Sequence, residues 1–346
     1  MAGSQDDETP SGEITREDIE FLHWWGIPTL FRCPPDEDPR NCDIALVGVP
    51  HSTGNGTTWR DQHMGPRAVR EHSPGYRRKH LRWHLDPWEA CRINDLGDVP
   101  ITHSLVNDTA VREIETFYRA IDQTGARPVS VGGDHSISLA ILRAIAGPQA
   151  NLSRGRPAAV VHFDAHYDTY DDFPNWFGAW DSAGHWASKS VHEGHVDATR
   201  SVQIGIRGHD WWMDPGKTSR ELGYRIVTKD EFDDELGIDG TIALIRERAG
   251  DLPIYISFDL DVLDTTIAPA VSNPEPGEEG LTMKEAIRVI QGMRGMDVIG
   301  ADVTELMPSI DGPSMMTAQN ATRICFELIC LIADRLSEAP ATGSAG

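Results

Sequence analysis

Short runs of apolar residues recur along the chain, and some of them end abruptly in acidic and histidine side chains. The run at 160–163 leads directly into Asp164, and His166 and Asp168 follow at every second position. Residues i, i+2 and i+4 of an extended strand share one face, so these three side chains are expected to converge where the strand leaves its sheet. Carboxylate and imidazole groups that converge in this way suit a divalent metal ion.

Two other apolar runs end in the same way. Residues 128–131 lead into the block Gly-Gly-Asp-His-Ser at 132–136, and residues 254–258 lead into Asp-Leu-Asp at 259–261. In an open α/β sheet the carboxyl ends of parallel strands, and the loops after them, lie along one edge where ligands bind. The three strand ends are therefore expected to pool six ligands.

The rest of the pattern alternates strands with helices of about ten to fifteen residues, which is typical of βαβ units in a parallel sheet. A continuous apolar run at 44–50 indicates a strand buried on both faces, and a helix is expected to begin at Gly65 and Pro66. Beyond these, helices are predicted around 108–124, 136–146, 238–249, 282–293 and 314–336. Strands are predicted at 128–131, 158–163, 201–206, 224–227, 253–258 and 297–302, with an irregular insert before the strand at 201.

Periodicity disappears at both ends of the chain. Residues 1–14 and 339–346 are rich in small and polar residues and are expected to be flexible tails. The length of 346 residues and the hydrophobic content of 39% allow a sizeable core. We expect a single domain over residues 15–338.

Composition argues against several classes of function. The net charge is −23, from 31 Lys and Arg against 54 Asp and Glu, whereas nucleic acid or an anionic membrane as partner requires a basic patch. Neither a bilayer-spanning apolar stretch nor a signal-peptide core is evident, so we expect a soluble, cytoplasmic protein. The five cysteines are scattered, which indicates neither a thiolate metal site nor a disulfide framework.

With its three ligand blocks in this order, the chain resembles the ureohydrolase family, the arginase and agmatinase enzymes. Matching blocks extend from about Val47 to Ala321 and include 164–168 (Asp-Ala-His-Tyr-Asp), 257–261 (Ser-Phe-Asp-Leu-Asp) and 304–308 (Thr-Glu-Leu-Met-Pro). The resemblance implies an arginase-like three-layer α/β/α fold with a central, mostly parallel sheet. It also implies a hydrolase with a binuclear metal site that cleaves a C–N bond of a small guanidino compound, releasing urea or a substituted urea and an amine.

The family pattern assigns the ligands of two divalent metal ions per subunit. One ion would be held by His135, Asp164, Asp168 and Asp259, and the other by Asp164, His166, Asp259 and Asp261. Manganese is the metal that the family implies. Imidazole and carboxylate ligands also suit nickel or cobalt better than a metal that prefers thiolates.

Three catalytic residues follow from the same resemblance. Two divalent ions make a hydroxide nucleophile available near neutral pH, and Asp261 would accept and pass on the proton of the attacking water. His185 corresponds to the family histidine after the second block and would protonate the leaving amine, which cannot leave as an anion. Glu305 corresponds to the acidic residue that pairs with the guanidinium group of the substrate.

The loops expected to select the substrate depart from the family pattern. The loop at 169–186 is long and carries Phe173, Trp176, Phe177, Trp180 and Trp186, the last in place of the usual glycine after the histidine. In the first loop Ser52 replaces a typical Asp and Trp59 is present, and 269–275 lacks the usual Gly-Thr-Gly-Thr motif. The Asn and Ser residues with which arginases bind an amino acid's carboxylate are not evident.

Aromatic loops can hold a weakly hydrated cation, so Trp180 and Trp186 are candidate substrate-binding residues. This favours an alkyl-substituted guanidine, or a biguanide such as metformin, over arginine, with agmatine and guanidino acids as further candidates. The alternative is that these aromatic residues only pack the loop or a subunit interface. His162 lies in the body of its strand, where a hydrogen-bonded core histidine is favoured over a ligand.

Other functions remain open at this stage. A formimino-group hydrolase would share the metal blocks, and the altered glycine after His185 also leaves open a metal-binding scaffold subunit without activity. The resemblance implies a homo-oligomer, a trimer or hexamer, and a hetero-oligomer with a related subunit is possible.

Overall fold

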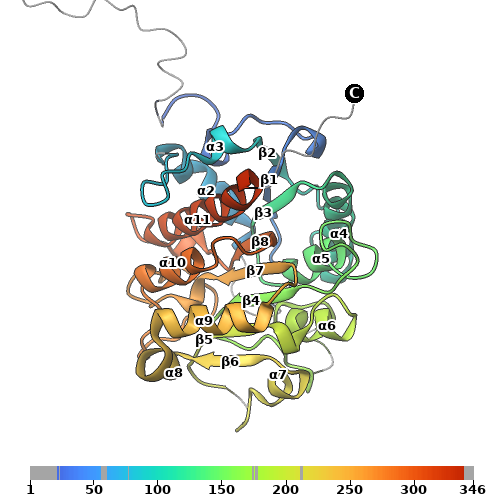
Figure 1. The fold of residues 1–346 in the computed structure, drawn as a ribbon, viewed down its shortest axis with the longest axis vertical. Helices are drawn as coiled ribbons and strands as arrows, with labels where there is room; N and C mark the ends of the chain where they lie inside the picture. Colours follow the sequence, from blue (N-terminus) through green and yellow to red (C-terminus); the bar gives the residue numbers. More distant parts are fainter. Residues whose placement is uncertain are drawn as a thin grey trace, which may run out of the picture.

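In the part of the chain that the computed structural model describes, eight parallel strands form one sheet, in the order β2-β1-β3-β8-β7-β4-β5-β6 (Figure 1). The strands are β1 (Ile44–Gly48), β2 (Ile93–Asp98), β3 (Arg127–Val131), β4 (Ala159–Phe163), β5 (Val202–Ile206), β6 (Arg225–Thr228), β7 (Ile254–Asp259) and β8 (Val298–Thr304). All pairings between neighbouring strands are parallel. The predicted fold class is confirmed.

The structure describes residues 22, 24–55, 61–76, 78–173, 175, 178–210 and 213–338. The tails predicted at 1–14 and 339–346 lie outside the described residues, as do Trp59, Trp176 and Phe177. Among the described residues, no helix is both long enough and apolar enough to cross a membrane.

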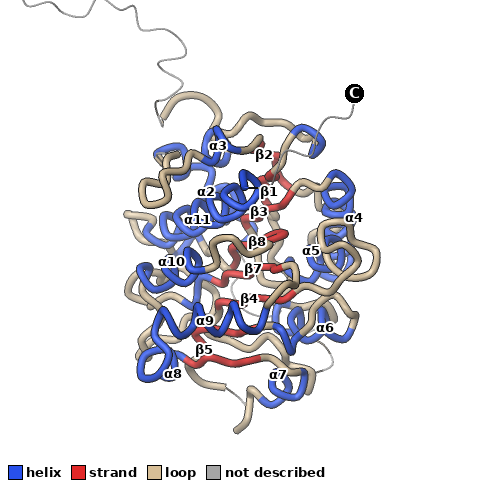
Figure 2. Tube along the Cα trace, in the orientation of Figure 1, coloured by secondary structure: helices blue, strands red, loops and turns tan. Residues whose placement is uncertain are grey.

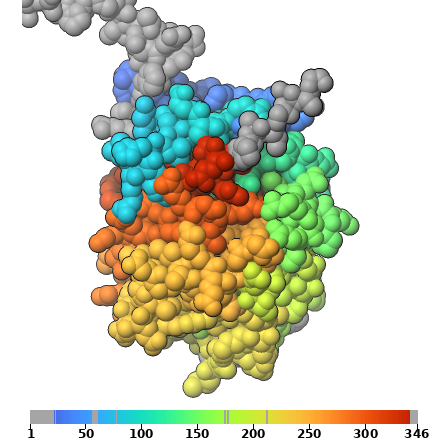
Figure 3. Space-filling model, viewed as in Figure 1, coloured from blue at the N-terminus to red at the C-terminus, as the bar shows by residue number. Residues whose placement is uncertain are grey.

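Helices cover both faces of the sheet, which gives the three layers (Figure 2). One layer holds α4 (Asn107–Thr124), α5 (Ile137–Ile145), α6 (Trp186–His192) and α7 (Lys217–Leu222). The other holds α2 (Gly65–His72), α3 (Pro87–Ala90), α8 (Lys229–Glu231), α9 (Gly237–Ala249), α10 (Met283–Gly292) and α11 (Met316–Glu338). Helix α11, in red, packs against α2 and α3, so the C-terminal helix lies beside N-terminal segments (Figure 3).

The apolar strands have a simple physical origin. In β4, Val161 and Phe163 point into the core on the side of α9 to α11, while Val160 points into the core on the side of α4 to α6. Because alternate residues enter two different cores, the strand must be apolar on both faces. This explains why such strands appear in the sequence as continuous apolar runs.

The predicted helices and strands are present with shifts of a few residues at their ends. Elements that were not predicted include the strand β2 and the helices α3, α6, α7 and α8. In α6 the buried face includes Ser188 and Ser190, both fully buried, beside Trp186 and Ala187. Small hydroxyl side chains on the buried face conceal the apolar period on which helix prediction depends.

The register of the sheet brings four strand ends to the same level. Val131 of β3 pairs with Val303 of β8, Val303 with Phe258 of β7, and Phe258 with Phe163 of β4. The residues that follow this row therefore emerge together at one edge of the sheet. All the predicted ligand blocks, and the block that contains Glu305, start there.

Candidate active site

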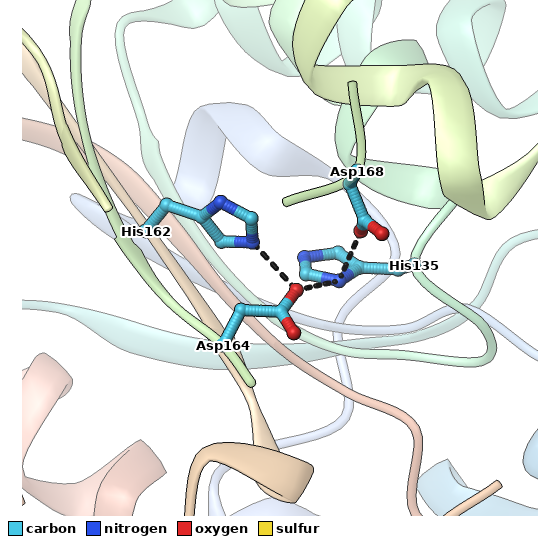
Figure 4. A group of neighbouring side chains, drawn as sticks. All are labelled: His135, His162, Asp164 and Asp168. Carbon is cyan, nitrogen blue, oxygen red and sulfur yellow. Dashed lines mark hydrogen bonds and ion pairs between the residues drawn. The ribbon is translucent and has the colours of Figure 1, made fainter. Parts of the chain in front are cut away.

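The first cluster of side chains at this edge surrounds His135. Its Nδ1 atom lies 3.2 Å from Oδ2 of Asp164, 3.1 Å from Oδ2 of Asp168 and 3.1 Å from Oδ2 of Asp259. In Figure 4 the carboxylates of Asp164 and Asp168 both point toward the ring of His135, and His162 approaches Asp164 from another side. All these side chains are buried, so three carboxylates meet one imidazole nitrogen away from bulk water.

The tautomer of His135 is fixed from the other side of its ring. Nε2 lies 2.7 Å from Oγ of Ser257, and the Ser257 hydroxyl donates to Oδ1 of Asp302 at 2.8 Å. Because the serine hydrogen is committed to Asp302, the Nε2–H of His135 donates to the serine oxygen. The neutral ring therefore presents the lone pair of Nδ1 to the three carboxylates, and within the described part of the chain this buried atom has no hydrogen-bond partner.

A second cluster shares one aspartate with the first. Nδ1 of His166 lies 2.9 Å from Oδ2 of Asp261 and 3.3 Å from Oδ1 of Asp164. Thus the two oxygens of Asp164 face different clusters, Oδ2 toward His135 and Oδ1 toward His166. Asp259 borders both, since its Oδ2 faces His135 while its Oδ1 accepts from the main-chain N–H of Asp261 at 2.8 Å.

The charges in these clusters attract positive charge. Burial alone would lower the pKa of His135, but the three aspartates that face Nδ1 outweigh burial and raise the pKa well above its ordinary value. Burial, together with the charges of Asp261 and Asp164, raises the pKa of Asp259 well above its ordinary value. Imidazole nitrogens and carboxylate oxygens arranged around a strongly negative point fit divalent cations such as Mn²⁺.

The six predicted ligands therefore come together, and His162 lies behind them. Its Nε2–H donates to Oδ2 of Asp164 at 2.7 Å, and its Nδ1 accepts from Nε2 of Gln203 at 3.2 Å. The residue is completely buried. The prediction of a hydrogen-bonded core histidine is confirmed, and the contact shows what it does: it orients the shared aspartate.

A cavity of about 370 Å³ opens above the two clusters. Its lining residues come from the ligand blocks, from the block that contains Glu305, from the three loops that the sequence indicated and from one further loop after β5: Asn55, His135, His166, Asp168, Tyr170, Ala183, Gly184, His209, Asp210, Asp259, Asp261, Ser272, Asn273, Pro274, Glu275 and Glu305. Glu305 is buried in this wall, with Oε1 accepting from the main-chain N–H of His135 at 2.7 Å and Oε2 accepting from Asn55 at 2.7 Å. Burial, with the nearby charge of Asp134, raises the pKa of Glu305 to about 7.

Comparison with known proteins decides the family. The arginase family matches residues 42–330. The chain belongs to the arginase family. It is 40% identical over 318 residues to the guanidinopropionase of Pseudomonas aeruginosa, which covers 91% of this chain and 94% of that protein.

Solved structures of the same family agree. The proclavaminate amidinohydrolase of Streptomyces clavuligerus superposes with a TM-score of 0.81 at 32% identity, covering 90% of this chain and 99% of that one. A hypothetical agmatinase from Burkholderia thailandensis superposes with a TM-score of 0.78 at 30% identity, covering 90% and 93% of the two chains. The predicted family and fold are confirmed, and this arginase-family chain is a metal-dependent amidinohydrolase.

Within this arginase-family site, the two predicted substrate-binding tryptophans do not line the cavity. Trp186 is completely buried below the first cluster, where its Nε1–H donates to Oδ2 of Asp168 at 2.7 Å. Trp180 lies at the surface with 53% of its area exposed. Trp186 was expected to contact the substrate. Its ring instead lies buried below the cavity, where it supports the predicted ligand Asp168.

His185 also lies apart from the cavity lining. Its Nδ1 pairs with Oγ of Ser182 at 2.6 Å, and its Nε2 pairs with the main-chain oxygen of Phe173 at 2.6 Å. Since a carbonyl only accepts, the Nε2–H must donate to it, and Nδ1 accepts from the serine. Both ring nitrogens are thus used to brace the loop between β4 and α6.

The sequence did not single out several polar residues of the cavity wall. Asn55, Ser272 and Glu275 lie in loops that were flagged as unusual, but nothing in their pattern indicates which side chains point inward. Asp210 and His209 lie in the loop after β5, which was not flagged at all. A useful signal was available for this loop, since it follows a parallel strand and must emerge at the ligand-binding edge.

Proposed function

We propose that this enzyme hydrolyses a C–N bond of a small guanidino compound, releasing urea or a substituted urea and an amine, with two divalent metal ions in its site. The observation that carries this proposal is the pair of clusters that share Asp164 at the floor of the cavity. His135, Asp168 and Asp259 complete the first set, and His166 and Asp261 the second, with Asp259 bordering both. Manganese is the metal we propose, with nickel and cobalt as alternatives.

The donor set fits such ions because each histidine presents Nδ1 while its Nε2 is held by another partner, Ser257 for His135 and Glu275 for His166. This is the arrangement by which proteins orient imidazole ligands. Two divalent ions held there would supply a hydroxide nucleophile from water at neutral pH. The remaining steps fall to the side chains around the cavity.

We assign binding of the guanidinium group to Glu305. Among the described residues its Oε1 accepts only from the main-chain N–H of His135, and a carboxylate oxygen can accept two hydrogen bonds. Asn55 and Gln62 donate to Oε2 and fix the carboxylate against the cavity wall. A guanidinium N–H on Oε1 would hold the substrate carbon above the two clusters.

We assign proton transfer to Asp261. It lines the cavity, and burial together with the charge of Asp164 raises its pKa, which suits a carboxylate that accepts a proton and then passes it on. His185, in contrast, would have to release the Phe173 carbonyl before it could protonate a leaving amine. Asp261 needs no such movement.

The cavity wall supports a cationic substrate without a carboxylate group. Besides the proposed metal ligands, Asp210, Glu275 and Glu305 line it, and none of its described lining residues is Lys or Arg. A guanidino acid would bring its carboxylate close to these acids without a Lys or Arg partner among the described lining residues. We therefore propose an alkyl-substituted guanidine, agmatine or a biguanide such as metformin as the substrate class, in preference to guanidino acids.

A substrate panel tests this proposal. The purified chain, loaded in turn with Mn, Co and Ni, is assayed with agmatine, methylguanidine, metformin, 3-guanidinopropionate and a formimino amino acid, and urea, amine and formamide are measured. Release of urea or a substituted urea from the compounds without a carboxylate is the expected result. Formamide release alone would favour a formimino-group hydrolase, and occupied metals without turnover would favour a scaffold subunit. Light scattering tests the expected trimer or hexamer.

A further inference from the structure

Trp186 contacts three residues of the metal site from below. Its ring lies 4.8 Å from that of His135, tilted by 32°, and 4.8 Å from that of His162, edge to face at 76°. Its Nε1–H donates to Oδ2 of Asp168 at 2.7 Å. The indole is completely buried, so its single polar group has this one carboxylate as its partner.

Asp168 needs such support because its backbone is unusual. Its φ angle is +52°, in the left-handed region that non-glycine residues seldom adopt. Its main-chain oxygen accepts from the N–H of Ala187 at 3.2 Å. Two consecutive residues at the start of α6 therefore hold Asp168, one by its side chain and one by its main chain.

The oxygen that Trp186 binds is the one that faces the first cluster. Oδ2 of Asp168 lies 3.1 Å from Nδ1 of His135 and also accepts the indole N–H. The indole thus sets the direction in which the carboxylate points. Hydrogen bonds of this kind orient ligands, and their loss typically weakens metal binding about 10–100-fold.

The same contact closes the base of the loop between β4 and α6. Asp168 and Trp186 flank residues 169–185, and inside this bridge the N–H of Tyr170 donates to the main-chain oxygen of Gly184 at 3.0 Å. Tyr170 and Gly184 both line the cavity. A change at Asp168 is therefore transmitted to a segment of the cavity wall.

We propose that Trp186 is a positioning residue of the metal centre, which fixes Asp168 as a ligand and couples the 169–185 loop to metal binding. The inference rests on the metal site of the proposed function but not on the identity of the substrate. In this role the indole affects metal affinity and the order of the loop, whereas a residue that contacts the substrate would affect KM.

Trp186→Phe tests the role, since phenylalanine keeps an aromatic ring against the two histidines but has no N–H. Trp88→Phe is the matched control, because the indole N–H of Trp88 also has a partner, Sγ of Cys33 at 3.2 Å, far from the site. Mn²⁺ affinity is measured by calorimetry on both variants and on the wild type. We expect Mn²⁺ to bind Trp186→Phe about 10–100-fold more weakly at one subsite and Trp88→Phe with unchanged affinity.

Hydrogen exchange, first of the wild-type protein and then of the variant, provides a second measurement. Addition of Mn²⁺ should slow amide exchange within 169–185, and this effect should shrink in Trp186→Phe. Mn²⁺ affinity of Trp186→Phe within about twofold of the wild type, a rise in KM with unchanged affinity, or exchange that does not respond to Mn²⁺ would each overturn the inference. A wild-type protein that binds two Mn²⁺ without hydrolysing any guanidino compound would refute the proposed function and leave this inference standing.

Discussion

Nε2 of His166 lies 3.3 Å from Oε1 of Glu275, which joins a proposed ligand at the end of β4 to the loop that follows β7. Glu275 also lines the cavity, so one carboxylate both orients the imidazole and adds negative charge to the wall. The loop at 269–275 is thus in direct contact with the metal site, as the loop at 169–185 is through Asp168 and Trp186.

The first prediction concerns this contact. Glu275→Gln removes the charge but keeps a similar shape, and we expect kcat/KM for a cationic guanidine to fall about 10–100-fold, with weaker Mn²⁺ binding. Steady-state kinetics and calorimetry measure both. Glu278→Gln is the control, because Glu278 accepts from the N–H of Gly208 and is not part of this cavity wall, so it should change kcat/KM less than twofold, as an approximate bound. Equal effects of the two substitutions would contradict the assignment.

Asp259→Ala removes the carboxylate that borders both clusters. Metal content and activity are expected to disappear together, because the remaining aspartates cannot complete either set. Elemental analysis of the dialysed protein gives the metal content. In the control, Asp264→Ala, the lost carboxylate accepts from Thr266 and from the main-chain N–H of Gly280 and is not a proposed ligand, so metal content should be unchanged. Two retained metal ions in Asp259→Ala would rule out this ligand set.

Glu305→Gln tests substrate binding without replacing the side chain of any proposed metal ligand. A neutral amide cannot pair with a guanidinium ion, so kcat/KM should fall at least about 100-fold, a loss of about 2.7 kcal/mol of transition-state stabilisation. Metal content should stay at the wild-type value. An unchanged kcat/KM would remove Glu305 from the site.

His185 is tested by two substitutions that separate its possible roles. His185→Ala is expected to keep its metal and to lose much of kcat, because the loop loses its brace to Phe173. His185→Gln can still donate from Nε2 to that carbonyl and should recover most of kcat if Asp261 carries the proton. A kcat as low as that of His185→Ala would instead support the histidine as the proton donor.

The ion pairs of Asp181 predict a pH-dependent part of the stability. Burial would raise the pKa of Asp181, but hydrogen bonds from Arg143 and Lys189 outweigh it and lower the pKa below its ordinary value. The folded pKa is therefore below the unfolded one, so this stabilisation is complete above about pH 4 and is lost as the pH falls through the folded pKa.

Asp181→Asn should accordingly reduce the free energy of unfolding at pH 7 by about 1–3 kcal/mol, with a smaller difference from wild type below about pH 4. Urea denaturation at several pH values measures this. Asp251→Asn is the control, because Asp251 is 84% exposed and its pairs with Arg156 and Arg200 should contribute at most about 1 kcal/mol. A difference that grows toward acid pH would contradict the sign of the effect.

The metal site could be predicted from the sequence because its geometry is local. Asp164, His166 and Asp168 follow directly after the short buried strand β4, so all three emerge at the same edge of the sheet. They do so although they lie beyond the end of the strand at Phe163 and Asp168 has a φ angle of +52°. The parallel topology then places the block with Asp259 beside them, as the register of Phe163 and Phe258 shows. Neither step needs knowledge of distant contacts.

The roles of Trp186 and Glu275 could not be predicted in this way. A tryptophan in an aromatic loop has the same local pattern whether its ring enters the cavity or the core. The position of the Trp186 ring is set by its contacts with Asp168, which lies 18 residues before it, and with His135, which lies still further away in the chain. Glu275 lies in a loop without regular period, so only the folded chain shows that it meets His166.

The most direct test of the proposed function is the rate of urea release from the purified chain as Mn²⁺ is added to the metal-free protein with a saturating guanidine substrate. We predict that the rate rises as two subsites per chain are filled and reaches its plateau at two equivalents of Mn²⁺. Asp259→Ala should release no urea at any Mn²⁺ concentration. Two bound equivalents without urea, or without any substituted urea, from every guanidino compound tested would contradict it.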